Sequence, residues 1–265
     1  MQWVAGVGAA TGRSIAYVGG LAELSAKSLR LLFLSPLKRR RMLQRATHEA
    51  MAAGVGAIPI VSLITFFVGV IIALQGAYEL QRLGAMQLVS GLVAIAITRE
   101  LGPLITAIVV IGRSGSAFAA EIGTMRVTEE LDALETMALD PVAFLVTPKF
   151  LAMAVMLPCL AIWADLMGIL GGSLFGVFGG GYTFGGYLLA TRDALLLRDI
   201  TSGVIKALVF GMVITAVGCH EGFTTGSGAE EVGRSTTSAV VISILLVILI
   251  DLVFTALFYL ARGGN

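Results

Sequence analysis

The chain carries an unbroken apolar stretch at residues 54–76, GVGAIPIVSLITFFVGVIIALQG, in which no side chain is charged. An α-helix of about 20 mostly apolar residues is long enough to cross the hydrocarbon core of a bilayer. The stretch therefore predicts a membrane-spanning helix, and it sets the class of fold that the rest of the chain must complete.

The composition agrees with that prediction. Of the 265 residues, 57% are hydrophobic and 13% are charged, whereas a soluble domain averages about 45–50% apolar and about 25% charged residues. So little charge cannot cover a soluble protein of this size, and the composition also excludes intrinsic disorder, a collagen-like fibre and a secreted disulfide scaffold. The formal net charge of +1 gives no global basic field for nucleic acid.

Four further apolar segments are long enough to span a bilayer, at residues 86–112, 142–179, 200–219 and 237–260. We therefore predict an all-α integral membrane protein with about five transmembrane helices. Glycine is abundant, at 33 residues, and in membrane helices it lets backbones approach closely.

Residues 1–53 differ from the rest, because they hold eight of the 18 lysines and arginines. Apolar residues recur there at near-helical spacing, which is typical of an amphipathic helix lying at the membrane surface. We expect two parts, a basic N-terminal interfacial helix and anchor at 1–53 and a transmembrane domain at 54–265. Because basic segments stay cytoplasmic, we expect the N-terminus inside and, after five spans, the C-terminus outside.

The segment 121–138, EIGTMRVTEELDALETMA, predicts a cytoplasmic helix between the second and third spans. Its apolar residues recur every three to four positions, while Glu129, Glu130, Asp132 and Glu135 make the opposite face acidic. One interpretation is a solvated surface helix. The other is a docking helix whose acidic face meets a basic partner.

Charged residues inside spans are costly, so each needs a partner or a role. Arg99 and Glu100 lie midway along the second span, where they either line a polar cavity or pair with Asp165 or Asp251 of other spans. Asp251 is the single charge of the last span, and we expect it to join helices through a hydrogen bond or salt bridge. Lys206 is expected to snorkel from near a helix end.

Four glycines of the third span are spaced four apart and form a stripe on one helix face: Gly168, Gly172, Gly176 and Gly180. Such a stripe predicts close helix packing, either within the chain or at a homodimer seam.

Three signals bear on chemistry. Ser114 lies in a GxSG pattern and His220 is one of two histidines, which leaves an intramembrane serine protease as a weak alternative. The carboxylates in the spans leave a proton-coupled secondary transporter as another. The sequence has neither a P-loop nor a metal-binding motif, so uphill transport requires a partner or an ion gradient.

The block at residues 99–141, RELGPLITAIVVIGRSGSAFAAEIGTMRVTEELDALETMALDP, resembles the signature region of the MlaE (YrbE-like) permeases. These are the membrane subunits of MCE-type ABC lipid transporters. The resemblance extends over roughly residues 50–260 and includes Leu74-Gln75-Gly76, the glycines of 171–173, Thr236-Thr237 and residues 250–257.

The resemblance implies a non-catalytic permease subunit in a bacterial inner membrane, working as a homodimer. Its partners would be a cytoplasmic ATPase that binds ATP and Mg, a periplasmic ring of MCE-domain proteins and, in some systems, a small regulatory subunit. The cargo would be phospholipid, and this chain itself would hold no cofactor. The helix at 121–138 would be the coupling helix, acting through residues Glu121, Arg126, Glu129, Glu130, Asp132 and Glu135.

The resemblance also implies an outward-opening lipid cavity at the dimer interface. Matched by motif, its lining would comprise Ile72, Gln75, Leu80, Leu83, Arg99, Glu100 and Leu101. Glu79 departs from the pattern, since the family often has an apolar residue there. In such a cavity the acyl chains would meet leucines and the headgroup would meet Arg99.

Overall fold

The computed structural model describes residues 16–31 and 39–262, and within them it is helical with no strand. The predicted all-α fold is therefore confirmed. Residues 1–15 and 32–38 of the predicted basic anchor lie outside the described residues. The main helices are α2 (Arg39–Ala53), α3 (Ile58–Arg82), α4 (Val89–Ala96), α5 (Gly102–Val110), α6 (Ser116–Val127), α7 (Glu130–Thr136), α8 (Thr147–Phe178), α9 (Phe184–Ala194), α10 (Leu197–Phe223) and α11 (Ala229–Arg262).

Five helical segments are long and apolar enough to cross a membrane, and each coincides with or contains one of the predicted spans, except that the third ends one residue earlier, at Phe178. Their bounds are Met42–Arg82, Met86–Val127, Val142–Phe178, Leu197–Phe223 and Ala229–Leu260. The second is longer than predicted. It continues past Gly112 because the GxSG pattern forms a π-helical turn, Ile111–Gly115, instead of ending the helix.

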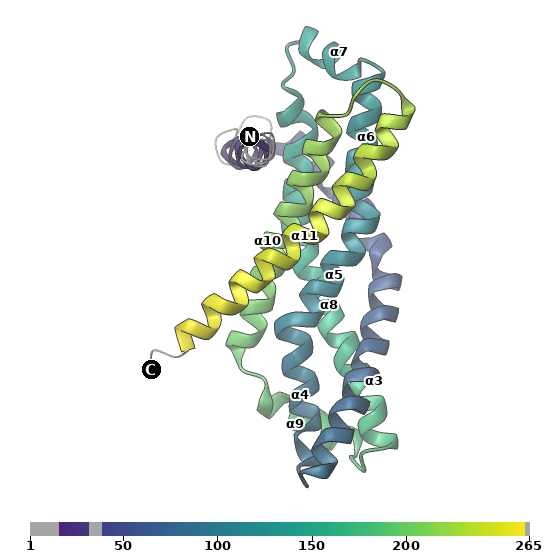
Figure 1. Ribbon diagram of the computed structural model, residues 1–265, viewed down its shortest axis with the longest axis vertical. Coiled ribbons are helices and arrows are strands. Elements are labelled where there is room, and N and C mark those ends of the chain that lie inside the picture. Colours follow the sequence, from purple (N-terminus) through teal and green to yellow (C-terminus); the bar gives the residue numbers. More distant parts are fainter. Residues whose placement is uncertain (1–15, 32–38, 263–265) are drawn as a thin grey trace, which may run out of the picture.

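Helices α3, α5, α8 and α10 run roughly along the long axis of the molecule (Figure 1). The third, α8, is central and packs most extensively against α3 and α10. In Figure 1, α11 crosses the bundle obliquely, and its C-terminal part diverges from the other helices. Most of the apolar surface of α11 is consequently exposed in a single copy of the chain.

Glycines let α8 approach its neighbours within the same chain. A Cβ atom on Gly171 would collide with the backbone of Phe66, and one on Gly172 or Gly176 would collide with the Tyr187 side chain of α9. Gly168 packs against Ile97 in the same way. The glycine stripe is thus an intramolecular packing surface. Its fourth predicted member, Gly180, lies beyond the end of α8 at Phe178.

The helix formed by residues 16–31 lies across one end of the bundle, where Figure 1 shows it almost end-on. Two polar contacts hold it there. Tyr17 Oη donates a 2.7 Å hydrogen bond to Glu221 Oε1, and Lys27 Nζ donates a 3.0 Å hydrogen bond to Asp140 Oδ1. Burial, reinforced by the neighbouring Glu221 carboxylate, raises the pKa of the Tyr17 phenol, so this hydroxyl remains a donor.

The segment 121–138 forms two helices, which corrects the expectation of one. It begins inside α6, breaks at Thr128 and Glu129, and resumes as α7. Glu129 has a φ of 60°, in the left-handed region, and the Thr128 hydroxyl donates back to the Thr124 carbonyl at 3.0 Å. No glycine or proline lies next to the break, so the periodic pattern of apolar residues does not predict it. The break turns α7 across the end of α6, where Figure 1 shows it.

Candidate functional sites

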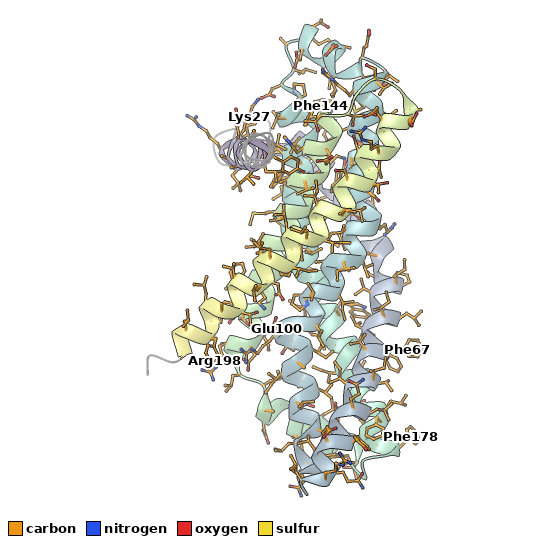
Figure 2. All side chains as sticks on the ribbon, viewed as in Figure 1. Lys27, Phe67, Glu100, Phe144, Phe178 and Arg198 are labelled. Atoms are coloured by element: carbon orange, nitrogen blue, oxygen red, sulfur yellow. The ribbon has the colours of Figure 1, made fainter. Side chains whose placement is uncertain are left out.

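A cluster of four polar side chains joins three of the membrane-spanning segments. A π-helical turn in the second segment, Ile97–Leu101, places Glu100 Oε2 2.5 Å from Lys206 Nζ of α10. The same Nζ lies 2.8 Å from Asp251 Oδ1 and 2.9 Å from Thr255 Oγ1, both of α11. Thr255 Oγ1 also donates to Glu100 Oε1 at 3.0 Å. We call these four residues the Lys206 cluster; Figure 2 labels Glu100 at mid-height of the bundle.

The cluster corrects two sequence interpretations. Lys206 does not snorkel, because only 1% of its side chain is exposed and its ammonium group faces two carboxylates. Asp165 is not among its partners. That side chain packs against the backbone of Gly102, and its buried Oδ1 has no hydrogen-bond partner among the described residues.

A pocket of about 260 Å³ lies beside the cluster, toward the α9 end of the bundle. Its charged members are Arg99, Arg198 and Asp199; Arg99 Nε is 3.7 Å from Asp199 Oδ1, whereas the Arg198 side chain is exposed. The remaining lining residues are Thr201, Ser202, Ile205 and Phe258. Two guanidinium groups and one carboxylate, set against Ile205 and Phe258, make a pocket that suits an anionic group with an apolar tail.

Sequence reasoning missed most of this pocket. A signal was present, because Arg198, Ser202 and Lys206 follow one another at intervals of four and so share one face of α10. The predicted span 200–219 contains a single charge, Lys206, and Arg198 lies just outside it.

The lining residues predicted on the first span and the turn after it, together with Leu101, lie apart from this pocket. Ile72, Leu80 and Leu101 are partly buried around an apolar cluster of α3 and α4, while Gln75 and Leu83 are exposed. Neither the three predicted residues of α3 nor Leu83, which follows it, lines the pocket of a single copy. A cavity that they share with Arg99 and Glu100 stays a prediction for an assembly of two chains.

The predicted coupling residues divide into two groups. Glu121 is half-exposed, and its Oε2 lies 2.8 Å from Nζ of Lys149, a fully buried residue of α8. Lys149 Nζ lies equally close to Glu49 Oε1 of α2. Arg126 joins α6 to α7 through Asp132, at 3.5 Å.

The second group forms the free face of α7. Leu131 is buried and anchors the helix, whereas Glu129, Glu130 and Glu135 are exposed. The carboxylates of these three residues are therefore accessible to a partner at this end of the molecule.

Ser114 and His220 are engaged with different partners. The buried Ser114 Oγ donates to the carbonyl of Ala53 at 3.3 Å, and the His220 ring packs edge-on against Tyr17. This arrangement gives no support to the protease alternative, since a nucleophilic serine needs a base within hydrogen-bond reach. No group of three or more potential metal ligands occurs in the part of the chain that the structure describes.

A bundle of five spanning segments, with a pocket that two arginines line and an acidic helix at one end, defines a multi-pass membrane protein of the transporter type. The family described as Permease MlaE matches residues 46–257, and the chain belongs to that family.

Relatives in both bacteria and plants share most of the chain. It is 40% identical over 212 residues to a "Probable ABC transporter permease protein" of Rickettsia prowazekii, covering 80% of this chain and 82% of the relative. It is 36% identical over 207 residues to the intermembrane phospholipid transport system permease protein MlaE of Haemophilus influenzae, covering 78% and 79%. It is 39% identical over 229 residues to the chloroplastic protein TRIGALACTOSYLDIACYLGLYCEROL 1 of Arabidopsis thaliana, covering 86% and 65%.

Proposed function

We propose that this chain is the permease subunit of an ATP-driven transporter that moves phospholipid between the bacterial inner membrane and a periplasmic MCE-domain partner. Family membership supports this, as does the phospholipid transport system named for the Haemophilus influenzae relative. The observation that carries the proposal is the pocket beside the Lys206 cluster. Arg99 and Arg198 supply the charge-assisted hydrogen bonds that a lipid phosphate needs, and Phe258 supplies an apolar wall.

The working unit we propose is a homodimer. The outward surfaces of α3 and α11 expose large apolar side chains along their length, including Phe67, Leu74, Leu245 and Leu252. Lipid covers some of this surface, and a second copy would cover the part that closes the cavity. Ile72, Gln75, Leu80 and Leu83 would then line it together with the pocket residues.

The orientation we propose places α7 and the helix of residues 16–31 on the cytoplasmic side, with the C-terminus in the periplasm. The acidic face of α7 would dock onto a cytoplasmic ATPase, which binds ATP and Mg and performs the hydrolysis. The periplasmic ring and, in some systems, a small regulatory subunit complete the assembly. No catalytic residue or cofactor is proposed for this chain.

The mechanism we propose passes through contacts within this chain. ATP binding moves α7, and α6 follows because Arg126 and Asp132 connect the two helices. Glu121 then pulls on Lys149 at the start of α8, so the second and third segments move together. Such motion would shift the dimer between a cavity-open and a cavity-collapsed state.

The test is lipid retention by a pocket variant. The full chain and its Arg198→Gln variant are purified in the same mild detergent, and the phospholipid carried by each is measured by mass spectrometry. We expect a several-fold loss in the variant, because one of two phosphate-binding guanidinium groups is removed. The matched control is Arg192→Gln on α9, which removes an exposed arginine outside the pocket. Equal lipid in Arg198→Gln and Arg192→Gln would contradict the proposal.

A further inference from the structure

A second pocket, of about 540 Å³, lies where the first and third spanning segments begin. It is formed between the polar helix α2 and the first turns of the third segment. Its lining comprises Gln44, Arg45, His48, Glu49, Phe144, Leu145 and Pro148, and we call it the Arg45 pocket. Figure 2 labels Phe144 near the α7 end of the molecule, whereas Arg198, which lines the pocket beside the Lys206 cluster, lies toward the other end.

Arg45 is a cation without an acidic partner in the part of the chain that the structure describes. Its guanidinium carbon lies 3.5 Å from the centroid of the Phe144 ring, and Nη1 donates to the Phe144 carbonyl oxygen at 3.4 Å. A guanidinium group has five N–H donors, so this stacking and one long hydrogen bond leave most of them to water or to a ligand. Arg45 is exposed, and its positive charge is therefore both positioned by Phe144 and accessible to an anion.

The acidic groups around the pocket are engaged by lysines. Glu49 is the one acid of the lining; 23% of its side chain is exposed, and its Oε1 lies 2.8 Å from Lys149 Nζ. Lys149 also binds Glu121, so these three groups carry a net charge of −1 when all are ionised. Asp140, in the connection that leads into the third segment, is paired with Lys27 at 2.9 Å. The excess of negative charge behind the pocket is thus a single unit.

Arginines of α2 outweigh that single unit at the boundary of the membrane. The first three residues of α2 are Arg39, Arg40 and Arg41, one turn before Arg45, and the uncharged stretch at 54–76 follows the helix directly. Basic residues next to a spanning helix attract the headgroups of anionic lipids. The opposite wall is apolar through Phe144, Leu145 and Pro148. A basic wall facing an apolar wall suits an anionic amphiphile better than a soluble anion.

We propose that the Arg45 pocket binds the headgroup of an anionic phospholipid that belongs to the surrounding bilayer and is not cargo. The lipid phosphate accepts hydrogen bonds from Arg45 and from the Gln44 amide, and the glycerol and upper acyl chains lie against Phe144. The bound lipid joins α2 to the beginning of α8, next to the ion pairs of Lys149. The pocket shares no residue with the one beside the Lys206 cluster, so the proposal stands whether or not the chain transports phospholipid.

Lipid titration followed by native mass spectrometry tests the proposal. The full chain is freed of bound lipid in mild detergent and titrated with dioleoylphosphatidylglycerol, which is anionic, or with dioleoylphosphatidylcholine, which has the same acyl chains and no net charge. The readout is the ratio of the two affinities. We expect the wild type to prefer the anionic lipid, and Arg45→Gln to bind it about fivefold more weakly and to lose the preference. Equal binding of the two lipids by the wild type, or an unchanged ratio in Arg45→Gln, overturns the proposal.

His48→Glu is a second variant that leaves the contact between Arg45 and Phe144 in place. His48 is exposed, so the substitution keeps the fold and adds a carboxylate to the pocket. We expect the same loss of preference, and a wild-type ratio in this variant overturns the proposal even if Arg45→Gln fails to fold. Excess glycerol 3-phosphate is added in a further titration. Displacement of the anionic lipid by it would mean that the pocket takes a soluble anion, which also overturns the proposal.

Two further arginines provide the matched controls. Arg30→Gln removes an exposed arginine of the helix 16–31, at the same end of the molecule but outside the pocket. Arg198→Gln removes an arginine of the other pocket, where it serves the phosphate that both lipids carry. We expect both variants to keep the wild-type ratio. A loss in Arg30→Gln equal to that in Arg45→Gln would mean diffuse attraction by surface charge, and an equal loss in Arg198→Gln would assign the preference to the other pocket; each overturns the proposal.

Discussion

Lys149 Nζ lies 2.8 Å from Glu121 Oε2, and this ion pair joins the end of the second spanning segment to the beginning of the third. The lysine is fully buried and also contacts Glu49 of α2 at 2.8 Å. Three segments that are distant in sequence thus meet at one ammonium group, close to the end of the bundle that carries α7. A displacement of α6 cannot leave α2 and α8 unaffected while these contacts persist.

Replacing Lys149 with methionine should separate ATP hydrolysis from transport. The apolar side chain fills a similar volume but makes neither ion pair, so we expect retained ATPase binding with strongly reduced lipid transfer. Stability should fall by about 2 kcal/mol, because two charge-assisted hydrogen bonds are lost. Reconstituted vesicles with the ATPase measure both activities. The control is Lys27→Met, which breaks an exposed pair with Asp140; equal loss of transfer in both variants would exclude a special role for Lys149.

Reversing the charge of the exposed acids of α7 should prevent docking of the ATPase. In the double variant Glu129→Lys and Glu130→Lys we expect loss of ATPase co-purification and of ATPase stimulation, with an unchanged fold because both side chains are exposed. Pull-down of the ATPase measures the effect. Glu79→Lys, an exposed acid on the last turns of α3, serves as the control. Undiminished stimulation in the double variant would refute docking through this face.

The left-handed conformation of Glu129 makes a stability prediction that is independent of function. Glycine adopts a φ of 60° without the steric penalty that a Cβ carries, so Glu129→Gly should stabilise the chain by about 0.5–1 kcal/mol. Glu135→Gly, at an exposed position inside α7, should instead lower stability. Thermal unfolding of the detergent-solubilised protein compares them. If both variants were less stable than the wild type, the Glu129 side chain would stabilise the fold by more than its left-handed backbone conformation destabilises it.

The sequence allowed the five spans to be predicted because a long apolar run is a local property, and each run proved to be helical. The ion pairs of Lys206 could not be predicted from the sequence. Which helix faces Lys206 depends on how α10 and α11 pack, and that is a tertiary property of residues far apart in the chain. The break at Glu129 escaped prediction for a related reason. No residue there is a strong helix breaker, and the packing of the buried Leu131 into the hydrophobic core is a tertiary contact that a local pattern does not reveal.

Because α3 and α8 pack closely, the glycines should differ strongly in how much stability the chain loses when each is replaced by alanine. Gly171→Ala should destabilise the chain by about 1–3 kcal/mol, because the added Cβ meets the Phe66 backbone and the helices must separate. Gly233→Ala, in α11 with open space around its Cα, should be neutral or slightly stabilising. Thermal unfolding again provides the comparison. Similar tolerance of alanine at both positions would show that α3 and α8 can part without cost.

Changing Glu100 or Leu101 in the turn Ile97–Leu101 should lower the amount of phospholipid that the proposed cavity holds. Glu100→Lys places a second ammonium group beside Lys206, and the repulsion should push α10 from the turn. Leu101→Asp introduces a carboxylate beside an apolar cluster of α3 and α4. We expect each to lower the phospholipid that co-purifies with the chain several-fold, as measured by mass spectrometry.

Glu100→Gln is the matched control for these two variants. It keeps hydrogen-bonding atoms at the same position and leaves Lys206 balanced by Asp251, so we expect it to retain lipid. Wild-type lipid levels in Glu100→Lys and Leu101→Asp would remove this turn from the binding surface. Equal loss in all three variants would instead mean that the ionised Glu100 carboxylate, and not the shape and charge balance of the cluster, holds the lipid in place.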